Sequence, residues 1–356
     1  MKRASPRDRA GPLPILVRVT ALGDGVDALA RESGFSGVVS VDRGDVPLLA
    51  KAYGLADRRH HIANTPATRF GIASGTKGLT ALTVVSLVED GALSLSTTAR
   101  SVLGRDLPLI DERVTVEHLL GHRSGIGDYF DEDADLEITD YQLTVPVHEL
   151  STTEAYLAVL DGYPAKFPPG ERFSYCNSGY VVLALIAERV AGRPFHELVR
   201  DRVCTPADMC STEFLRSDEL PPGTATGYLP IEGVSRTNVF HLPVRGSGDG
   251  GIYSTADDIS ALWRALYAGK IVSRDWVTRM TRPHSDVPSE GRRYGLGFWL
   301  HALHDTVMLT GYDAGVSFRS VHDPRAGLTH TVLSNTSDGA WKISRYLDRE
   351  LVPAPE

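Results

Sequence analysis

Ser74-Gly75-Thr76-Lys77 has the order S-x-x-K and places a hydroxyl and a primary amine three residues apart. From Leu79 to Val88 apolar residues recur at helical spacing, and Gly91 supplies a stop. Residues i and i+3 share a helix face, so the Lys77 amine can reach the Ser74 hydroxyl if this segment opens a helix. A desolvated lysine can take the proton of a serine. The stretch therefore predicts a serine–lysine pair at a helix N-terminus.

The same stretch also has simpler interpretations. A serine at a helix start most often only caps the helix, and a single S-x-x-K motif is weak evidence of catalysis. The residues from Gly71 to Lys77 resemble a phosphate-binding loop, but the order is Gly-Thr-Lys and the glycine spacing is short, so we discard nucleotide binding. No G-x-S-x-G occurs, and an α/β-hydrolase nucleophile is therefore not indicated.

Two further polar motifs follow the quartet along the chain. Tyr175-Cys176-Asn177 is predicted to lie in a loop between Pro168-Pro169-Gly170 and a buried helix over 179–190. A tyrosine beside a lysine can titrate with it as a pair, and an asparagine offers both a donor and an acceptor. Thr310-Gly311 lies within the strand-rich C-terminal part. Each motif alone could be ordinary packing, and their value lies in their order.

Composition and charge limit the classes of partner. The chain has 356 residues, 42% of them hydrophobic and 23% charged, as expected for a globular protein with a substantial core. A net charge of −8 without a dense basic stripe argues against nucleic acid as a partner. No apolar run approaches the roughly 18 residues of a membrane helix, so we expect no membrane partner.

The N-terminus, the cysteines and the histidines bear on compartment and cofactors. The apolar patch Leu13 to Val17 ends at Arg18 and is shorter than the apolar region of about 7–15 residues in a secretory signal. Three cysteines form no disulfide framework and fit a reducing compartment, so we expect a cytoplasmic protein. His118 and His122 have i, i+4 spacing but lack the glutamate of H-E-x-x-H. We therefore expect no metal and no cofactor.

Strand signals occupy both ends of the chain. Phe35 to Val41 and Val46 to Tyr53 predict a hairpin. Four strand-like segments joined by tight links follow near the C-terminus: Tyr294 to His301, Thr306 to Thr310, Val316 to His322 and Leu328 to Leu333. Such short links join antiparallel neighbours. A helix with one apolar face is predicted over Ala340 to Leu351. Because the middle of the chain is mostly helical, the pattern predicts an α+β fold.

Seven blocks of sequence, in a fixed order, resemble the serine beta-lactamase-related family. They are FSGVVSV from Phe35, TPATRFGIASGTKGLTAL around Ser74, VTVEHLLGHRSGIGDY from Val114, PPGERFSYCNSGYVVLALI from Pro168, GDGGIYSTADDISAL from Gly248, YGLGFW from Tyr294 and TGYDAGVSF from Thr310. The family includes penicillin-binding DD-peptidases, class C beta-lactamases, family VIII carboxylesterases and D-amino-acid peptidases or amidases. The resemblance implies a beta-lactamase/transpeptidase-like fold. Its antiparallel sheet would be built from N- and C-terminal strands, flanked by helices, and would lie beside a mostly helical lobe.

The resemblance also implies one catalytic domain over residues 1–356. An α/β lobe would comprise approximately 1–75 and 248–356, and a helical lobe approximately 76–247, with the site between them. Within that site Ser74 would be the acylated nucleophile and Lys77 its base.

The remaining motifs complete the implied site. Tyr175 would pass a proton to the leaving group, and Asn177 would bind the acyl side of the substrate. The oxyanion hole would combine the N–H of Ser74 with one on the third-motif strand, at Tyr312. Thr310 and Gly311 would contact the substrate on that strand. Tyr312, together with Asp313, would line the acyl pocket and influence selectivity.

Leu309-Thr310-Gly311 departs from the family pattern, in which the third motif usually begins with lysine or histidine. The missing cation normally helps to bind a substrate carboxylate, and a charge-assisted hydrogen bond contributes about 1.5–3 kcal/mol. We therefore expect an uncharged ester or amide to be preferred. Carboxylate-bearing substrates should bind worse unless another cation substitutes.

The leading hypothesis is a metal-free serine hydrolase that acts through an acyl-enzyme on a small ester or amide. A D-amino-acid peptidase or amidase, or an acyltransferase, would use the same nucleophile and differ in pocket shape. A non-catalytic member of the fold that binds a ligand is the alternative of another class, since the altered third motif leaves it open. The sequence does not indicate an oligomeric state.

Overall fold

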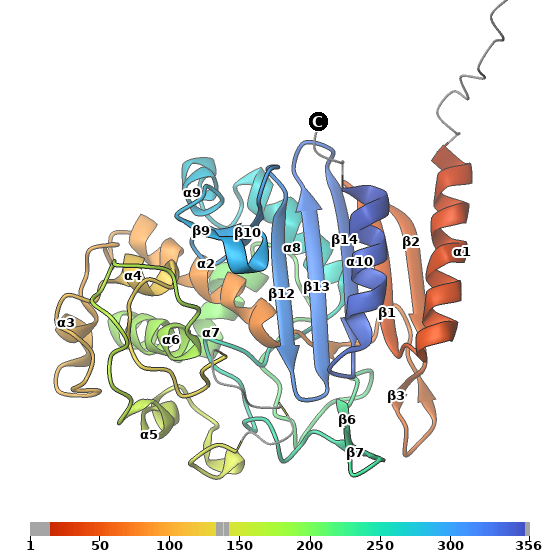
Figure 1. Cartoon of the computed structure of the whole chain (residues 1–356). Helices are drawn as coiled ribbons and strands as arrows, with labels where there is room; N and C mark the ends of the chain where they lie inside the picture. Colours follow the sequence, from red (N-terminus) through yellow and green to blue (C-terminus); the bar gives the residue numbers. More distant parts are fainter. Residues whose placement is uncertain (1–14, 133–137, 139–141, 353–356) are drawn as a thin grey trace, which may run out of the picture.

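An eight-stranded antiparallel sheet forms the centre of the molecule, in the order β2-β1-β14-β13-β12-β11-β10-β9 (Figure 1). The structure, a computed structural model, describes residues 15–132, 138 and 142–352. The strands of this sheet are β1 Gly37–Arg43, β2 Val46–Tyr53, β9 Ser285–Val287, β10 Arg292–Tyr294, β11 Trp299–His301, β12 Val307–Asp313, β13 Val316–Asp323 and β14 Leu328–Ser334. The N-terminal hairpin joins the C-terminal strands where β1 pairs with β14, so the prediction of strands from both chain ends in one sheet is confirmed.

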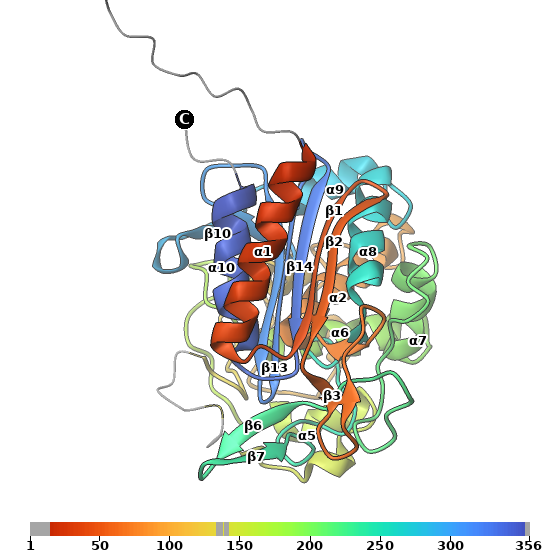
Figure 2. The ribbon, with the colours of Figure 1, turned by 90° about the vertical axis from the view of Figure 1, so that its right-hand side faces the viewer.

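Helices cover both faces of this sheet and build the region beside it. They are α1 Ile15–Ser33, α2 Thr76–Glu89, α3 Ala99–Leu103, α4 Val116–Leu120, α5 Leu157–Leu160, α6 Asn177–Ala191, α7 Phe195–Val199, α8 Ala256–Ala268, α9 Arg274–Met280 and α10 Gly339–Leu351. The pair α1 and α10 lies side by side on one face, and α8 lies on the other (Figure 2). The short strands are β3 Leu55–Asp57, β4 Ile62–Ala63, β5 Phe70–Gly71, β6 Tyr228–Ile231, β7 Val234–Thr237 and β8 Tyr253–Ser254.

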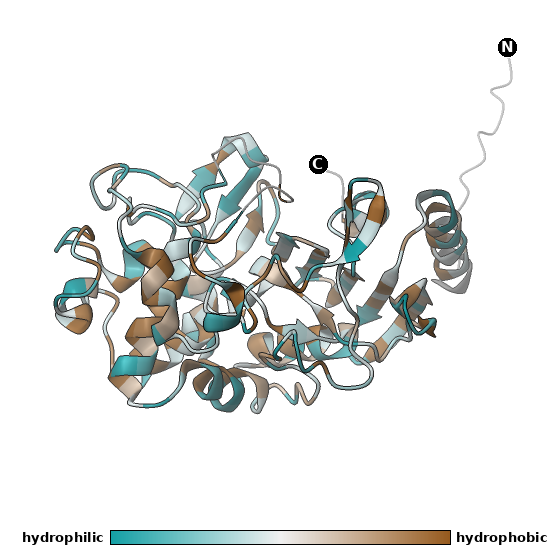
Figure 3. Ribbon diagram, turned by 90° about the horizontal axis from the view of Figure 1, so that it is seen from below, coloured by the Kyte–Doolittle hydropathy of each residue, from teal (hydrophilic) through white to brown (hydrophobic). Residues whose placement is uncertain are grey.

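Two apolar cores hold these layers together. The smaller one lies between the sheet and the α1–α10 pair, where Val26 and Ile343 are fully buried. The larger one lies beneath the opposite face and extends through α2 and α6, whose residues Leu82 and Leu183 are fully buried. Central helices of the helical region are accordingly apolar along much of their length, whereas many surrounding loops are hydrophilic (Figure 3). The predicted division into two lobes with those boundaries stays a prediction.

Three details differ from the sequence-based expectation. Helix α1 occupies a region that the sequence analysis did not assign to any element. The segment from Tyr294 to His301, expected as one strand, is split into β10 and β11 because Gly297, with φ +90°, turns the chain between them. Asn177 is the first residue of α6 and not part of the preceding loop. Within the described ranges, no helix has the length and apolarity that a bilayer span needs.

Candidate active site

Ser74 lies on a tight turn immediately before α2. The turn is the 3-10 segment Ala73–Gly75, which follows β5 and is fixed at its start by a hydrogen bond from Ile72 N to Ile252 O of 2.9 Å. Ala73 has φ +44°, an uncommon conformation for a residue with a side chain. Gly75 follows because a Cβ there would lie 2.4 Å from the ring of Phe318. A strained turn of this kind presents one side chain at a fixed position.

Lys77 is buried and makes three short contacts through its amine. Nζ lies 2.9 Å from Ser74 Oγ, 2.7 Å from Asn177 Oδ1 and 2.8 Å from the carbonyl oxygen of Asp249, while the residue is only 2% exposed. The i, i+3 contact expected from the sequence is therefore present. The structure also brings Asn177 to the same amine from 100 residues farther along the chain.

Burial favours the neutral form of the Lys77 amine. Burial lowers the pKa of Lys77, although the negative charges of Asp249 and Glu132 work against this shift. The Asn177 and Asp249 oxygens can only accept hydrogen bonds. The contact with Ser74 Oγ has Nζ as donor in the resting arrangement. In the neutral form, the amine donates its two hydrogens to Asn177 and Asp249, and its lone pair is left for the hydroxyl of Ser74. This geometry suits removal of the serine proton.

The orientation of Asn177 is fixed by its surroundings. Its Nδ2 donates to Phe130 O at 2.8 Å and to Glu132 Oε1 at 3.3 Å, which leaves Oδ1 for Lys77. Its backbone N–H donates to Asp128 Oδ2 at 2.7 Å, and the next N–H, of Ser178, donates to Asp128 Oδ1 at 2.8 Å. Asp128 thus occupies the position of a carboxylate cap at the start of α6. The sequence analysis did not assign a role to Asp128 or to Glu132.

Tyr175 covers the serine–lysine pair from the side of the helical region. The Lys77 amine lies 4.9 Å from the centre of its ring, and the ring contacts His122 at 4.3 Å between centroids and stacks on Trp299 at 6.0 Å. Burial raises the pKa of the Tyr175 hydroxyl well above its usual value, and a hydrogen bond with Ser74 partly opposes the shift. A hydroxyl of this kind keeps its proton and can donate it to a group bound at Ser74.

His122 packs against the ring of this tyrosine. It is buried, and its Nδ1 accepts a hydrogen bond from Cys176 N at 3.1 Å. Burial and the nearby charge of Lys77 lower its pKa well below the usual value, so the ring is neutral.

Strand β12 passes directly against the turn that carries Ser74. A Cβ on Gly311 would lie 2.1 Å from Ile72 O and 3.0 Å from Ser74 N, so only glycine allows this approach. Leu309, 2% exposed, faces the larger core, where its side chain packs against Gly78. Because neighbouring residues of a strand face opposite sides, Thr310 faces away from that core. Tyr312 is 43% exposed at the edge of the site.

Asp313 ends the strand beside this site. Its Oδ1 accepts a hydrogen bond from Ala314 N at 2.8 Å, and burial raises the pKa of its carboxyl to about 7. It is not among the described residues that line the pocket at Ser74. Its predicted role in selectivity stays a prediction.

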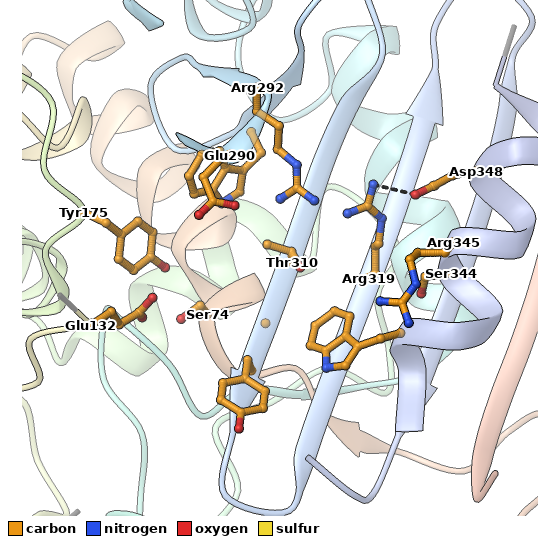
Figure 4. A pocket seen from close by; sticks show the side chains of 14 residues that line it. Ser74, Glu132, Tyr175, Glu290, Arg292, Thr310, Arg319, Ser344, Arg345 and Asp348 are labelled. Atoms are coloured by element: carbon orange, nitrogen blue, oxygen red, sulfur yellow. Dashed lines mark ion pairs between the residues drawn. The ribbon is translucent and has the colours of Figure 1, made fainter. Parts of the chain in front are cut away.

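A cavity of about 380 Å³ opens over the serine (Figure 4). Five of the predicted site residues line it, namely Ser74, Tyr175, Thr310, Gly311 and Tyr312. The sequence analysis missed its other lining residues: Glu132, Glu290, Arg292, Trp299, Arg319, Trp341, Ser344, Arg345 and Asp348. Glu132 belongs to an acidic run over 131–135, and residues 133–135 lie outside the described part. Among the described residues, no group of three or more His, Cys, Asp or Glu is arranged to hold a metal ion.

An antiparallel sheet between helices, with an S-x-x-K pair at the first turn of a buried helix, defines a beta-lactamase/transpeptidase-like fold. The chain belongs to the beta-lactamase family, whose model, described as "Beta-lactamase", matches residues 24–352. The crystal structure of a penicillin-binding protein from Bacillus halodurans is similar, with 35% identity and a TM-score of 0.85 over 91% of this chain and 99% of that one.

Two curated relatives extend the comparison. A putative penicillin-binding protein, PbpX of Bacillus subtilis (strain 168), is 30% identical over 76% of this chain and 63% of its own length. This chain therefore spans less than two thirds of that relative. Esterase EstB of Burkholderia gladioli is 26% identical over 87% of this chain and 88% of its own.

Proposed function

We propose that the protein is a serine hydrolase that acts on a small ester or amide through an acyl-enzyme. The observation that carries the proposal is the contact of 2.9 Å between Ser74 Oγ and a buried lysine amine whose other two partners are acceptors. Packing alone does not require a serine hydroxyl beside this buried amine, so the contact indicates a chemical role. The likeness to an esterase over nearly the full length of both chains supports an ester substrate.

In the proposed reaction, Ser74 Oγ attacks the carbonyl carbon while its proton moves to the Lys77 amine. The carbonyl oxygen becomes an oxyanion that the N–H groups of Ser74 and Tyr312 stabilise. Tyr175 donates its proton to the leaving oxygen or nitrogen, and Lys77 returns a proton to Tyr175. The acyl–serine ester forms as the bond to the leaving group breaks. Water then attacks this ester, and the same groups release the acid and restore Ser74.

The test compares wild type with Ser74→Ala on p-nitrophenyl acetate and butyrate, together with labelling by a fluorophosphonate probe. We expect turnover and labelling in wild type and loss of both in Ser74→Ala. Ser96→Ala, at an exposed serine in the loop after α2, is the matched control and should behave as wild type. Absence of labelling and turnover in folded wild type would instead support the non-catalytic, ligand-binding alternative.

We also propose a cytoplasmic location. The support is that all three cysteines are free, with Cys176 and Cys204 buried and Cys210 exposed. Cell fractionation with an antibody tests it, and recovery outside the cytoplasm would contradict it.

A further inference from the structure

One wall of the cavity at Ser74 is formed by residues that belong to none of the three sequence motifs of the site. Figure 4 shows the guanidinium groups of Arg292, Arg319 and Arg345 on one side of Thr310, and Ser74 and Tyr175 on the other. The three arginines come from β10, β13 and α10.

Strand pairing and helix periodicity explain why β13 and α10 present their residues to the cavity. Arg319 is paired with Thr310 across β12 and β13, so both side chains lie on the same face of the sheet. On α10, Trp341, Arg345 and Asp348 are spaced by three or four residues and form one stripe along the helix. The sheet and this stripe together form the wall of the cavity opposite the serine.

Arg319 already has a fixed partner. One of its terminal nitrogens lies 2.7 Å from Asp348 Oδ2, and the other oxygen of Asp348 lies 2.9 Å from His330 Nε2. The Arg319 side chain is only 12% exposed. Its charge is therefore balanced, and the guanidinium is held in place by the helix.

Arg292 is in a different situation. Its side chain makes no hydrogen bond or ion pair with any residue in the described ranges; its guanidinium carbon lies 5.7 Å from the centre of the Trp299 ring. Burial and the nearby charge of Arg319 lower its pKa to about 10. Glu290 lines the same cavity but forms no ion pair with it. The negative charges of Glu290 and Asp348 oppose this pKa shift only in part. A partly buried cation without a bonded counter-charge is unfavourable, and an anion that binds beside it reduces this penalty.

We propose that Arg292, with Arg319 beside it, binds a carboxylate of the substrate. This inference rests on the proposed function and names its substrate class: esters or amides that carry a carboxylate away from the reacting carbonyl. A guanidinium matches a carboxylate with two parallel hydrogen bonds, which a single ammonium cannot do. The sequence alone favoured uncharged substrates because Leu309 replaces the usual cation. Arg292 supplies the substitute cation from another strand, while Leu309 serves the core.

Matched pairs of esters test the proposal. On the leaving-group side the pair is meta-acetoxybenzoate and meta-acetoxybenzamide. On the acyl side it is the p-nitrophenyl esters of para-carboxybenzoate and para-carbamoylbenzoate. In at least one pair we expect kcat/KM to favour the carboxylate by roughly tenfold or more, the size of one charge-assisted contact. A ratio at or below one in both pairs overturns the proposal.

Variants then assign the preference to Arg292. In Arg292→Gln the ratio of kcat/KM for the carboxylate ester to kcat/KM for the amide ester should fall to about one. In Arg292→Lys this ratio should lie between those of wild type and Arg292→Gln, because an ammonium lacks the paired donors of a guanidinium. Arg325→Gln removes an arginine whose side chain is 82% exposed and should keep the wild-type ratio. Since Arg292→Gln removes an unpaired charge, its thermal midpoint should not fall. An unchanged ratio in Arg292→Gln overturns the proposal.

A binding measurement separates this inference from the proposed function. Calorimetry of Ser74→Ala with meta-hydroxybenzoate and meta-hydroxybenzamide needs no turnover. Tighter binding of the carboxylate, lost in the double variant with Arg292→Gln, supports the subsite even if no ester is hydrolysed. If ester hydrolysis depends on Ser74 but shows no preference for a carboxylate, the proposed function stands and the proposed carboxylate subsite is wrong.

Discussion

The two sides of the cavity differ in how completely their polar groups are paired. On the serine side, the Lys77 amine has three close partners, and the amide nitrogen and backbone N–H of Asn177 also have theirs. On the opposite side, neither Arg292 nor Arg345 makes an ion pair with a described residue. Paired groups are held in position before the substrate arrives, which suits bond-making chemistry. Unpaired cations gain a partner only when a ligand binds, which suits recognition.

Replacement of the base should have the largest effect. Lys77→Gln keeps a polar side chain of similar length but removes the group that accepts the serine proton. We expect kcat/KM for p-nitrophenyl acetate to fall about a thousandfold, within the range for loss of a general base. A thermal melt serves as the control for folding. A decrease in kcat/KM of less than tenfold in a folded variant would mean that the serine side of the cavity does not carry out the reaction.

The approach of β12 to the serine turn should be the next most sensitive feature. In Gly311→Ala the added methyl group would lie 2.1 Å from Ile72 O, so the strand or the turn must move. We expect kcat/KM to fall about a hundredfold, as when one oxyanion-hole donor is lost. Gly179→Ala is the matched control, because a Cβ there meets only ordinary contacts, the nearest at 3.6 Å. Similar rates in the two variants would contradict the inferred importance of this approach.

Removal of the Asp128 carboxylate, which caps the start of α6 at Asn177, should have a smaller effect. Asp128→Ala removes the acceptor of two N–H groups at the start of α6 and should lower the free energy of unfolding by about 1–2 kcal/mol. Because Asn177 is then less well held, we expect kcat/KM to fall about tenfold. Urea denaturation and kinetics measure the two effects. Asp128→Asn retains one acceptor oxygen, so its stability and its kcat/KM should lie between those of Asp128→Ala and wild type. Unchanged activity in Asp128→Ala would contradict the positioning role of Asp128.

Electrostatic coupling should produce the smallest change. The negative charge of Glu132 favours the protonated form of Lys77 and so raises its pKa. Glu132→Gln removes that charge, and the pKa of Lys77 falls further. Since the neutral amine is the active form, the acidic limb of the kcat/KM profile should move to lower pH. The pH dependence of p-nitrophenyl acetate hydrolysis measures this, and a shift to higher pH would contradict the neutral-base assignment.

The sequence contained most of the fold and only the serine side of the cavity. Spacing alone predicted that Ser74 and Lys77 meet. Tyr175 and Asn177 were candidates from their sequence motif, and the resemblance assigned their roles because the motifs have a fixed order. Helix α1 was missed although Leu22, Val26 and Ala30 recur every four residues, since its start was considered only as a possible secretory signal.

The arginine side could not be predicted because no local pattern marks it. Arg292, Arg319 and Arg345 stand on three separate elements, and only the strand pairing and the placement of α10 bring them together. Glu132 was missed for a similar reason, since its partner Asn177 is 45 residues away. Contacts of this kind depend on tertiary structure and leave no periodicity in the chain.

Helix α10 gives this arrangement a practical consequence. Its inner residues, such as Ile343 and Leu347, anchor it to the sheet, while Trp341 and Arg345 form part of the cavity wall. This part of the cavity wall and the catalytic residues therefore lie in different stretches of the sequence. We expect exchange of Trp341 and Arg345 on this single C-terminal helix to reshape the cavity wall and leave the nucleophile untouched.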